Sequence, residues 1–246
     1  MKKISLCIPN YTRTNYIIES FRDIIDDDRI DEILINDDCS PNFEEALILL
    51  NNLKSDKIKI FRNEQNLGPM FNKLETIKKA TNEFCILLDS DNVISKEYLD
   101  IVFSQEWSRN KIICPEFLMH HDENIWNQKD VFISYSDFIN TKIDFEYVKN
   151  SILNGRNIET LLNTGNFFVN KEMYINSFIN NVFDRSVDVC DVCFFSYLFL
   201  LFDKKNYLEV CKDLKYIHRV HNGSFYLNNA HNGEAQLRIL RENFVK

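Results

Sequence analysis

The first ninety residues alternate between short apolar runs and amphipathic segments, and this alternation constrains the fold more than any other feature. The apolar runs have the length of β-strands and cover 4–8, 32–35, 58–61 and 84–88. The segments between them place apolar residues at helical spacing over 15–25, 41–53 and 69–80. Strands that alternate with helices form βαβ units, whose strands are parallel and whose crossovers are right-handed. The sequence therefore predicts an α/β fold with a central, mostly parallel sheet.

Three of these four strands end on side chains that can bind a ligand. The first leads into Pro9, Asn10, Tyr11, Thr12 and Arg13, the second into Asp37 and Asp38, and the last into Asp89, Ser90 and Asp91. Parallel strands present their carboxyl ends at one edge of the sheet, which is where open α/β folds bind ligands. We therefore expect these groups to lie together in a binding site.

The last of these strand ends indicates a metal site. Asp89 and Asp91 are separated by one small residue, and two such carboxylates can converge on a hard divalent cation such as Mg2+ or Mn2+. The same residues also suit a turn that caps a helix, and in isolation a short aspartate motif favours that simpler interpretation. The polar groups at the other strand ends favour the metal.

Glycine usage excludes two common nucleotide-binding motifs. The chain contains only five glycines, and no glycine-rich loop follows the first strand. Neither a Gly-x-Gly-x-x-Gly dinucleotide motif nor a P-loop is therefore present in the sequence. The phosphates of a bound nucleotide would need another source of positive charge, and a metal at Asp91 could supply it.

Composition excludes several further classes. A net charge of −8 argues against binding to the backbone of a nucleic acid. No apolar run reaches membrane-spanning length, and the N-terminus lacks the pattern of a signal peptide. The seven cysteines lie mostly within apolar runs, which indicates reduced thiols. We expect a cytoplasmic protein without a transmembrane segment.

The second half of the chain has a weaker pattern. Apolar runs predict strands over 111–114, 167–169 and 216–220. Helices are expected over 187–201 and 234–246, whereas 120–151 shows no clean period and is expected to mix loops with short helices. The C-terminal helix is expected to pack on the body of the protein, with peripheral contact to a membrane or a second subunit as the alternative.

Four short motifs occur in a specific order and spacing. They are Ser-Leu-Cys-Ile-Pro-Asn-Tyr-Thr-Arg at 5–13, Ile-Leu-Ile-Asn-Asp-Asp-Cys-Ser at 33–40, Asn-Glu-Gln-Asn-Leu-Gly-Pro at 63–69 and Asp-Ser-Asp-Asn at 89–92. In these motifs the chain resembles the family 2 glycosyltransferases of the GT-A fold. Looser matches at 164–165, 190–191 and 219–224 extend the resemblance to about Ser224.

The resemblance implies transfer of a sugar from a nucleotide diphosphate, usually UDP, with inversion at the anomeric carbon. By position, Pro9 and Tyr11 would flank the base, and Asp38 would accept a hydrogen bond from the uracil ring. Arg13 and Ser90 would belong to the same donor pocket.

The resemblance also implies the metal-binding and catalytic residues. Asp91 would coordinate a Mn2+ or Mg2+ ion that bridges the diphosphate, and Asp89 would contact the ribose or the hydrated metal. His221, in the loop after the last strand, would contact the metal or the diphosphate when the site closes. Asp191 resembles the general base that deprotonates the acceptor hydroxyl.

Two of these assignments leave an alternative open. The family often has an acidic residue immediately before its base, whereas this chain has Cys190, so Asp188 is a rival for the catalytic role. His218 competes with His221 for the metal, although the Asn-Gly-Ser that follows favours His221.

We therefore predict one GT-A domain, an αβα sandwich with a central, mostly parallel sheet. Residues 1–105 would bind the nucleotide sugar, and residues 106–246 would bind a glycan or glycoconjugate acceptor. The predicted activity is that of a metal-dependent, inverting hexosyltransferase. The alternatives are a sugar-nucleotide pyrophosphorylase, which would need a glycine-rich basic loop after the first strand, and a non-catalytic nucleotide- or carbohydrate-binding member of the fold.

Overall fold

The computed structural model describes residues 2–122, 131–162, 165–179, 191–220 and 234–246. The strands are β1 (Ile4–Asn10), β2 (Ile30–Asp37), β3 (Ile58–Arg62), β4 (Phe84–Leu87), β5 (Lys111–Asp122), β6 (Val131–Ser134), β7 (Ile143–Asp144), β8 (Phe168–Asn170) and β9 (Tyr207–Val220). The helices are α1 (Thr14–Phe21), α2 (Phe43–Asn51), α3 (Pro69–Lys78), α4 (Lys96–Ser104), α5 (Phe145–Leu153), α6 (Glu159–Leu162), α7 (Lys171–Ile179), α8 (Asp191–Phe202) and α10 (Glu234–Val245). Two short 3-10 turns, η1 (Arg22–Ile24) and η2 (Ser136–Phe138), complete the described elements.

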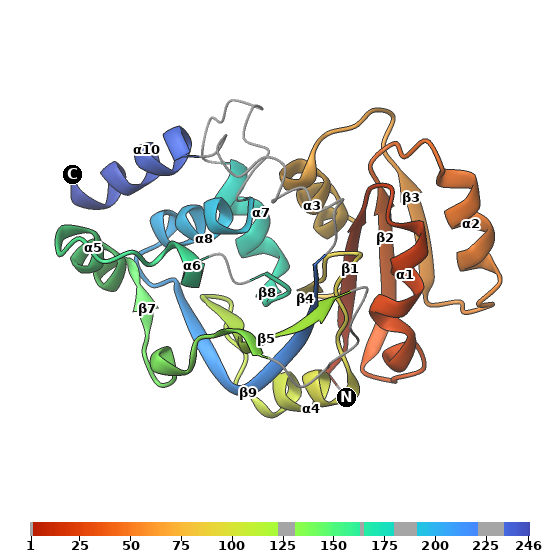
Figure 1. Ribbon diagram of the computed structural model, residues 1–246, viewed down its shortest axis with the longest axis horizontal. Coiled ribbons are helices and arrows are strands. Elements are labelled where there is room, and N and C mark those ends of the chain that lie inside the picture. The colour runs from red at the N-terminus through yellow and green to blue at the C-terminus, as the bar shows by residue number, and fades with distance from the viewer. Residues whose placement is uncertain (1, 123–130, 163–164, 180–190, 221–233) are drawn as a thin grey trace.

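The described strands form one nine-stranded sheet with helices on both faces (Figure 1). Its order is β3-β2-β1-β4-β8-β5-β9-β7, and β6 pairs with β5 off this path. Strands β3, β2, β1 and β4 run parallel to one another, whereas β8 pairs antiparallel with β4. β1 is buried along its whole length, as expected for a strand covered on both faces. The predicted α/β architecture is therefore confirmed.

Helices α3, α7 and α8 pack against one another over one face of the sheet (Figure 1). The residues of α8 from Val192 to Leu200 are all buried, because this helix is apolar on every side. Phe195, near its middle, contacts the rings of Tyr174 and Phe178 on α7, with centroids 4.0 and 5.6 Å away. The helix predicted over 187–201 is confirmed from Asp191 onward. These aromatic contacts fix α8 against α7, which in turn packs on α3.

The second half contains more regular structure than the sequence predicts. Helices α4, α6 and α7 are absent from the prediction, whereas α5 begins in the segment 120–151, where loops and short helices are expected. Asp144 begins α5, since its side chain accepts a hydrogen bond from the Tyr147 N–H (3.0 Å). Strands β5 and β9 also extend well beyond the predicted 111–114 and 216–220. They pair with each other in parallel over most of their length.

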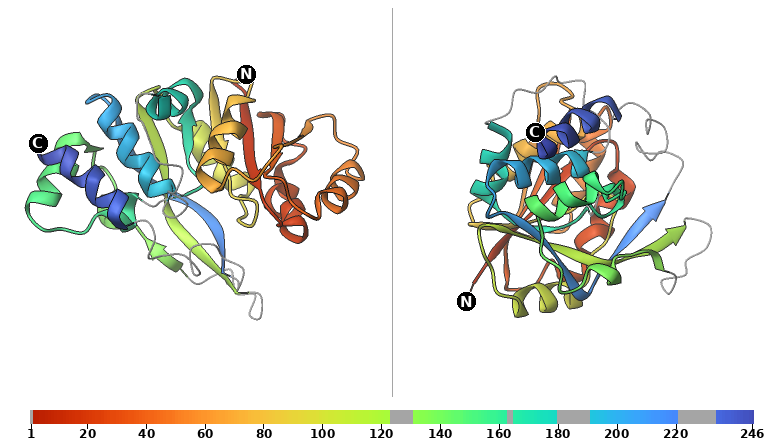
Figure 2. Two further views of the ribbon diagram at one scale, coloured as in Figure 1. Left: turned by 90° about the horizontal axis from the view of Figure 1, so that it is seen from above. Right: turned by 90° about the vertical axis from the view of Figure 1, so that its left-hand side faces the viewer.

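The C-terminal helix α10 packs against α5 at one end of the molecule. Figure 2 shows α5 and α10 together at the end farthest from α2. Phe244 of α10 stacks on Phe145 of α5 with ring centroids 4.9 Å apart, so the predicted C-terminal helix does pack on the body.

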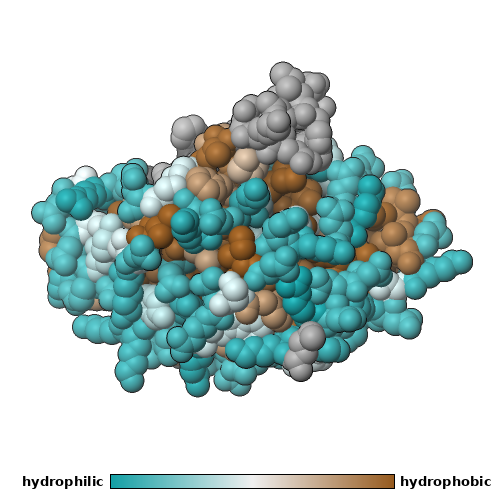
Figure 3. Space-filling view, turned by 90° about the horizontal axis from the view of Figure 1, so that it is seen from below, coloured by the Kyte–Doolittle hydropathy of each residue, from teal (hydrophilic) through white to brown (hydrophobic). Residues whose placement is uncertain are grey.

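The face in Figure 3 is mostly polar, with apolar side chains in small groups. Within the described part of the chain, every helix is too short or too polar to cross a membrane.

Candidate active site

The loops after β1 and β2 lie next to each other at the carboxyl edge of the sheet. The backbone N–H of Asp38 donates a hydrogen bond to the carbonyl of Asn10 (2.8 Å). Pro9 is buried at the end of β1, whereas Tyr11 is 46% exposed. The predicted pair Pro9 and Tyr11 thus presents an exposed aromatic ring beside the loop that contains Asp38.

Asp38 is buried, and its carboxylate binds the segment that leads into α3. Oδ1 accepts hydrogen bonds from the Asn63 side-chain amide (2.8 Å) and the Leu67 N–H (2.9 Å). Oδ2 accepts a hydrogen bond from the Gly68 N–H (2.9 Å). Gly68 has a φ of 82°, a conformation that favours glycine, and Pro69 then begins the helix. Asp38 therefore sets where α3 starts, and its predicted contact with uracil stays a prediction.

Helix α3 carries a buried lysine that joins the two halves of the site. Lys73 Nζ lies 2.8 Å from Asp89 Oδ1, in the loop after β4, and 2.5 Å from Asp191 Oδ2, at the start of α8. The Lys73 side chain is only 8% exposed. Two predicted site residues that are about a hundred positions apart in the sequence therefore share one protein cation.

Burial and neighbouring charges shift the pKa values of this cluster. Burial raises the pKa of Asp89, the charge of Lys73 opposes this shift, and the charges of Asp191 and Asp91 reinforce it. Burial alone would lower the pKa of Lys73, but Asp191 and Asp89 outweigh burial and raise it above its ordinary value. Lys73 is therefore positively charged throughout the neutral pH range.

The segment before β8 fits closely against Asp89. Asn166 Oδ1 accepts a hydrogen bond from the Asp89 N–H (2.8 Å), and the Asn166 carbonyl accepts one from the Tyr98 hydroxyl (2.5 Å). A Cβ atom added at Gly165 would lie 3.5 Å from Asp89 Oδ2, so the backbone passes close to this carboxylate. Residues of the second half therefore hold the backbone of Asp89 and lie close to its carboxylate.

Two arginines hold Asp91 from opposite ends of the chain. Arg13 Nε lies 3.3 Å from Asp91 Oδ2, and Arg219 Nε donates a hydrogen bond to the Asp91 carbonyl (3.1 Å). Arg219 is 7% exposed. Its guanidinium also pairs with Glu19 (2.6 Å) and lies over the ring of Tyr16, 4.5 Å from the centroid. Arg219 thus anchors the predicted metal-binding loop to both α1 and β9.

The structure describes fewer contacts for the remaining predicted site residues, and it leaves two of them undescribed. Ser90 is buried between the two carboxylates of its motif. Asp188 and His221 lie outside the described residues. His218 lies on β9, where its ring stacks on Phe132 with centroids 5.6 Å apart. The choices between Asp188 and Asp191, and between His218 and His221, therefore stay predictions.

The described residues offer two carboxylates to a divalent cation. No group of three or more His, Cys, Asp or Glu side chains is placed to bind a metal within the ranges that the structure describes. The side chains of Asp89 and Asp91 are 31% and 23% exposed, and each contacts a protein cation. Mg2+ and related ions often use one or two carboxylates and take their other ligands from water and substrate phosphates. The two carboxylates therefore fit a divalent cation that binds together with a diphosphate.

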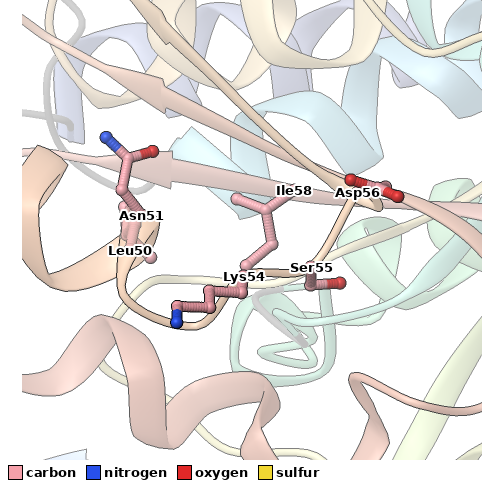
Figure 4. A pocket seen from close by; sticks show the side chains of 6 residues that line it. All are labelled: Leu50, Asn51, Lys54, Ser55, Asp56 and Ile58. Carbon is pink, nitrogen blue, oxygen red and sulfur yellow. The ribbon is translucent and has the colours of Figure 1, made fainter.

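A surface hollow elsewhere does not belong to this site. Figure 4 shows the residues that line it: Leu50, Asn51, Lys54, Ser55, Asp56 and Ile58. They come from the end of α2 and the start of β3, at the amino edge of the sheet. The carboxylates of the site follow the carboxyl ends of β2 and β4, so the hollow and the site lie at opposite edges.

Sequence reasoning missed Lys73, Asn166 and the contacts of Arg219. Lys73 carried a signal, because it lies three residues after Met70 and four before Ile77, both of which are buried. A lysine on the buried face of a helix needs a carboxylate partner, since unpaired buried lysines are rare. The contacts of Asn166 and Arg219 carried no such signal, because their partners are distant in the sequence.

Comparison with known proteins supports one family. A family model described as Glycosyl transferase family 2 matches residues 5–188. Abequosyltransferase RfbV of Salmonella typhimurium strain LT2 is 33% identical over 103 residues, which are 40% of this chain and 31% of the relative. The uncharacterized glycosyltransferase RC0461 of Rickettsia conorii is 35% identical over 100 residues, which are 40% of this chain and 16% of the relative. These matches thus cover less than a third of either curated relative.

Solved structures support the fold. The structure of S. aureus TarS 1–349 in complex with UDP-GlcNAc matches with a TM-score of 0.69 and 17% identity, covering 98% of this chain and 66% of that chain. The same protein in complex with UDP matches with a TM-score of 0.62 and 17% identity, over 99% of this chain and 70% of that chain. This likeness shows the GT-A fold. Because the family model also spans more than half of the sequence, the chain belongs to glycosyl transferase family 2.

Proposed function

We propose that this chain transfers a sugar from a nucleotide diphosphate, with UDP as the favoured nucleotide, to a hydroxyl group of a glycan or glycoconjugate. One observation carries the proposal: the Lys73 ammonium contacts both Asp89, beside the donor loops, and Asp191, at the start of α8. Glycosyl transfer requires a leaving-group site and a general base next to each other. Family membership supports the reaction class, and the fold shared with UDP-bound and UDP-GlcNAc-bound TarS supports UDP.

In this proposal, residues 1–105 bind the donor and residues 106–246 form the acceptor side. Tyr11, which is exposed, lies against the base, and Pro9 supports the same loop. Asp38 accepts a hydrogen bond from the uracil ring while it holds the start of α3. Ser90 belongs to the same pocket.

Asp91 and Asp89 would hold Mn2+ or Mg2+, with His221 as a further ligand. When bound, the cation supplies Lewis-acid stabilisation of the negative charge that develops on the departing diphosphate. Lys73 and Arg13 add the positive charge of two protein side chains next to the same carboxylates. The chain therefore surrounds the leaving group with positive charge despite its acidic composition.

Asp191 acts as the general base of the proposed reaction. Its Oδ2 contacts Lys73, so Oδ1 is the oxygen that we assign to the proton of the acceptor hydroxyl. The acceptor oxygen then forms its bond to the anomeric carbon as the bond to the diphosphate breaks on the opposite face. A single displacement of this kind needs no covalent nucleophile and inverts the anomeric centre.

Inversion is a testable outcome. We expect the product to have the anomeric configuration opposite to that of the donor, because attack and departure occur on opposite faces. Proton NMR of the anomeric signal during turnover measures this directly. A product that retains the donor configuration would contradict a single displacement with Asp191 as base.

The donor assignment is tested by thermal denaturation with UDP, GDP, CDP and dTDP, each in Mn2+ and in EDTA. We expect UDP to raise the melting temperature in a concentration-dependent manner and only with Mn2+, since ligand binding stabilises the folded state by mass action. Asp91→Asn should abolish the metal-dependent part of the shift. The control is Asp100→Asn, which removes a carboxylate that is 64% exposed and pairs with Arg29.

The outcomes separate the alternatives. Unchanged UDP affinity of Asp91→Asn in Mn2+ would remove Asp91 from the metal site. A UDP shift without turnover on any donor and acceptor would indicate a binding protein that has kept the fold. No shift with any nucleotide would contradict the proposed donor class.

A further inference from the structure

Arg13 is placed where a protein cation competes with a metal ion. It lies in the loop between β1 and α1, and its Nε is 3.3 Å from Asp91 Oδ2. Both side chains are partly exposed, 20% for Arg13 and 23% for Asp91. An ion pair that reaches solvent and meets at this longer distance is weaker, and exchanges more readily, than a buried pair at short distance. A divalent cation that binds Asp91 must share this carboxylate with Arg13 or displace it.

Lys73 and Arg13, which form ion pairs with these carboxylates, differ in how firmly they are held. Lys73 is 8% exposed and lies between two carboxylates, Asp89 and Asp191. Displacing a buried ammonium from two carboxylates would leave buried charge without a partner, which is costly. The Arg13 side chain is more exposed and meets Asp91 at a longer distance. Arg13 is therefore the cation that can change its partner.

The charges of the cluster favour such an exchange. Among the described residues, three carboxylates, those of Asp89, Asp91 and Asp191, make ion pairs with two side-chain cations, those of Lys73 and Arg13. A divalent cation added alone would bring the cluster to a net positive charge, with Arg13 close to the new ion. A diphosphate supplies the negative charge that balances it. The cation and the diphosphate therefore bind more favourably together than separately.

We propose that Arg13 pairs with Asp91 until a donor arrives and then transfers its guanidinium to the diphosphate, while the divalent cation takes Asp91. This inference rests on the proposed function and deepens it. A planar guanidinium suits the new partner, because it donates two parallel hydrogen bonds to phosphate oxygens. Arg13 thereby makes metal and donor binding cooperative, and the coupling is reciprocal.

The test compares Arg13→Met with the wild-type protein in two binding measurements. Without nucleotide, Mn2+ should bind about three- to tenfold tighter to the variant, because the competing charge is gone. In saturating Mn2+, UDP should bind about tenfold more weakly, because a charge-assisted contact to phosphate is lost. Free Mn2+ is measured by electron paramagnetic resonance and UDP binding by calorimetry. Opposite shifts of the two affinities would not follow from a general loss of structure.

Two further variants sharpen the result. Arg13→Lys keeps a charge and should fall between the wild type and Arg13→Met in both affinities. Arg29→Met removes an arginine of the same 20% side-chain exposure, which pairs with Asp27 and Asp100, and should change neither affinity. Equal or weaker Mn2+ binding by Arg13→Met would overturn the exchange, and if the wild type still binds UDP the proposed function survives. A wild-type protein that binds no UDP would overturn both.

Discussion

Replacing Lys73 with methionine is expected to lower the free energy of unfolding at neutral pH by about 3 kcal/mol, because it leaves two adjacent carboxylates without their cation. The pKa of Lys73 is raised, so its contribution to stability is fully present below the ordinary lysine pKa of about 10.4 and is lost only at more alkaline pH. In the variant, Asp89, whose pKa burial already raises, takes up a proton as the pH falls. The loss should therefore shrink as the pH falls from neutral towards the raised pKa of Asp89, as measured by urea denaturation.

A matched control lies on the same helix. Lys78, also on α3, pairs with Glu75, and its side chain is 41% exposed, so Lys78→Met should change stability by no more than about 0.5 kcal/mol. Asp89→Asn in the Lys73→Met background should recover part of the loss, because it removes one of the unpaired charges. Similar losses for the two lysine variants would show that Lys73 is not the cation that holds the cluster together.

Asp191→Asn should lower turnover by about 100- to 10,000-fold, the range expected when a general base is lost. The amide cannot take the acceptor proton, but its carbonyl oxygen can still accept a hydrogen bond from Lys73. The fold and the affinity for UDP in Mn2+ should therefore stay close to those of the wild type. Turnover is measured with a UDP-sugar and an accepted glycan, and UDP affinity by calorimetry.

The control for this variant is at the other end of the same helix. Asp203, just after α8, accepts a hydrogen bond from the Lys205 N–H (2.9 Å), and Asp203→Asn should change neither turnover nor UDP affinity. Wild-type turnover in Asp191→Asn would transfer the role of base to Asp188. A loss of UDP affinity equal to the loss of turnover would instead assign Asp191 to donor binding.

The first half of the chain could be predicted because its signals are local. Strands β1 and β2 are buried on almost every residue, and such strands appear in a sequence as continuous apolar runs. Each run ends directly on the polar residues of the site, so the position of Asp38, Asp89 and Asp91 at the carboxyl edge follows from the parallel topology alone.

The second half could not be predicted as fully because distant partners stabilise its elements. Pro115 looks like the end of a strand, but β5 continues through a bulge at this point. The next residue, Glu116, stabilises the bulge by accepting a hydrogen bond from the Asp213 N–H of β9 (2.6 Å). No local pattern reports a bond between residues 97 positions apart. The same reason hid the contact between Lys73 and Asp191.

The insertion of β8 between β4 and β5 has a consequence for biosynthesis. As the chain leaves the ribosome, β4 emerges with its loop of carboxylates, but the Asn166 amide that orients Asp89 follows 77 positions later. Until then one edge of β4 has no neighbour, and an unpaired strand edge is a template for aggregation. Lys73 likewise lacks one of its two carboxylate partners until Asp191, at the start of α8, has been synthesised. The nascent first half therefore displays the carboxylates without their final geometry, and the complete candidate site should be among the last features that the folding chain forms.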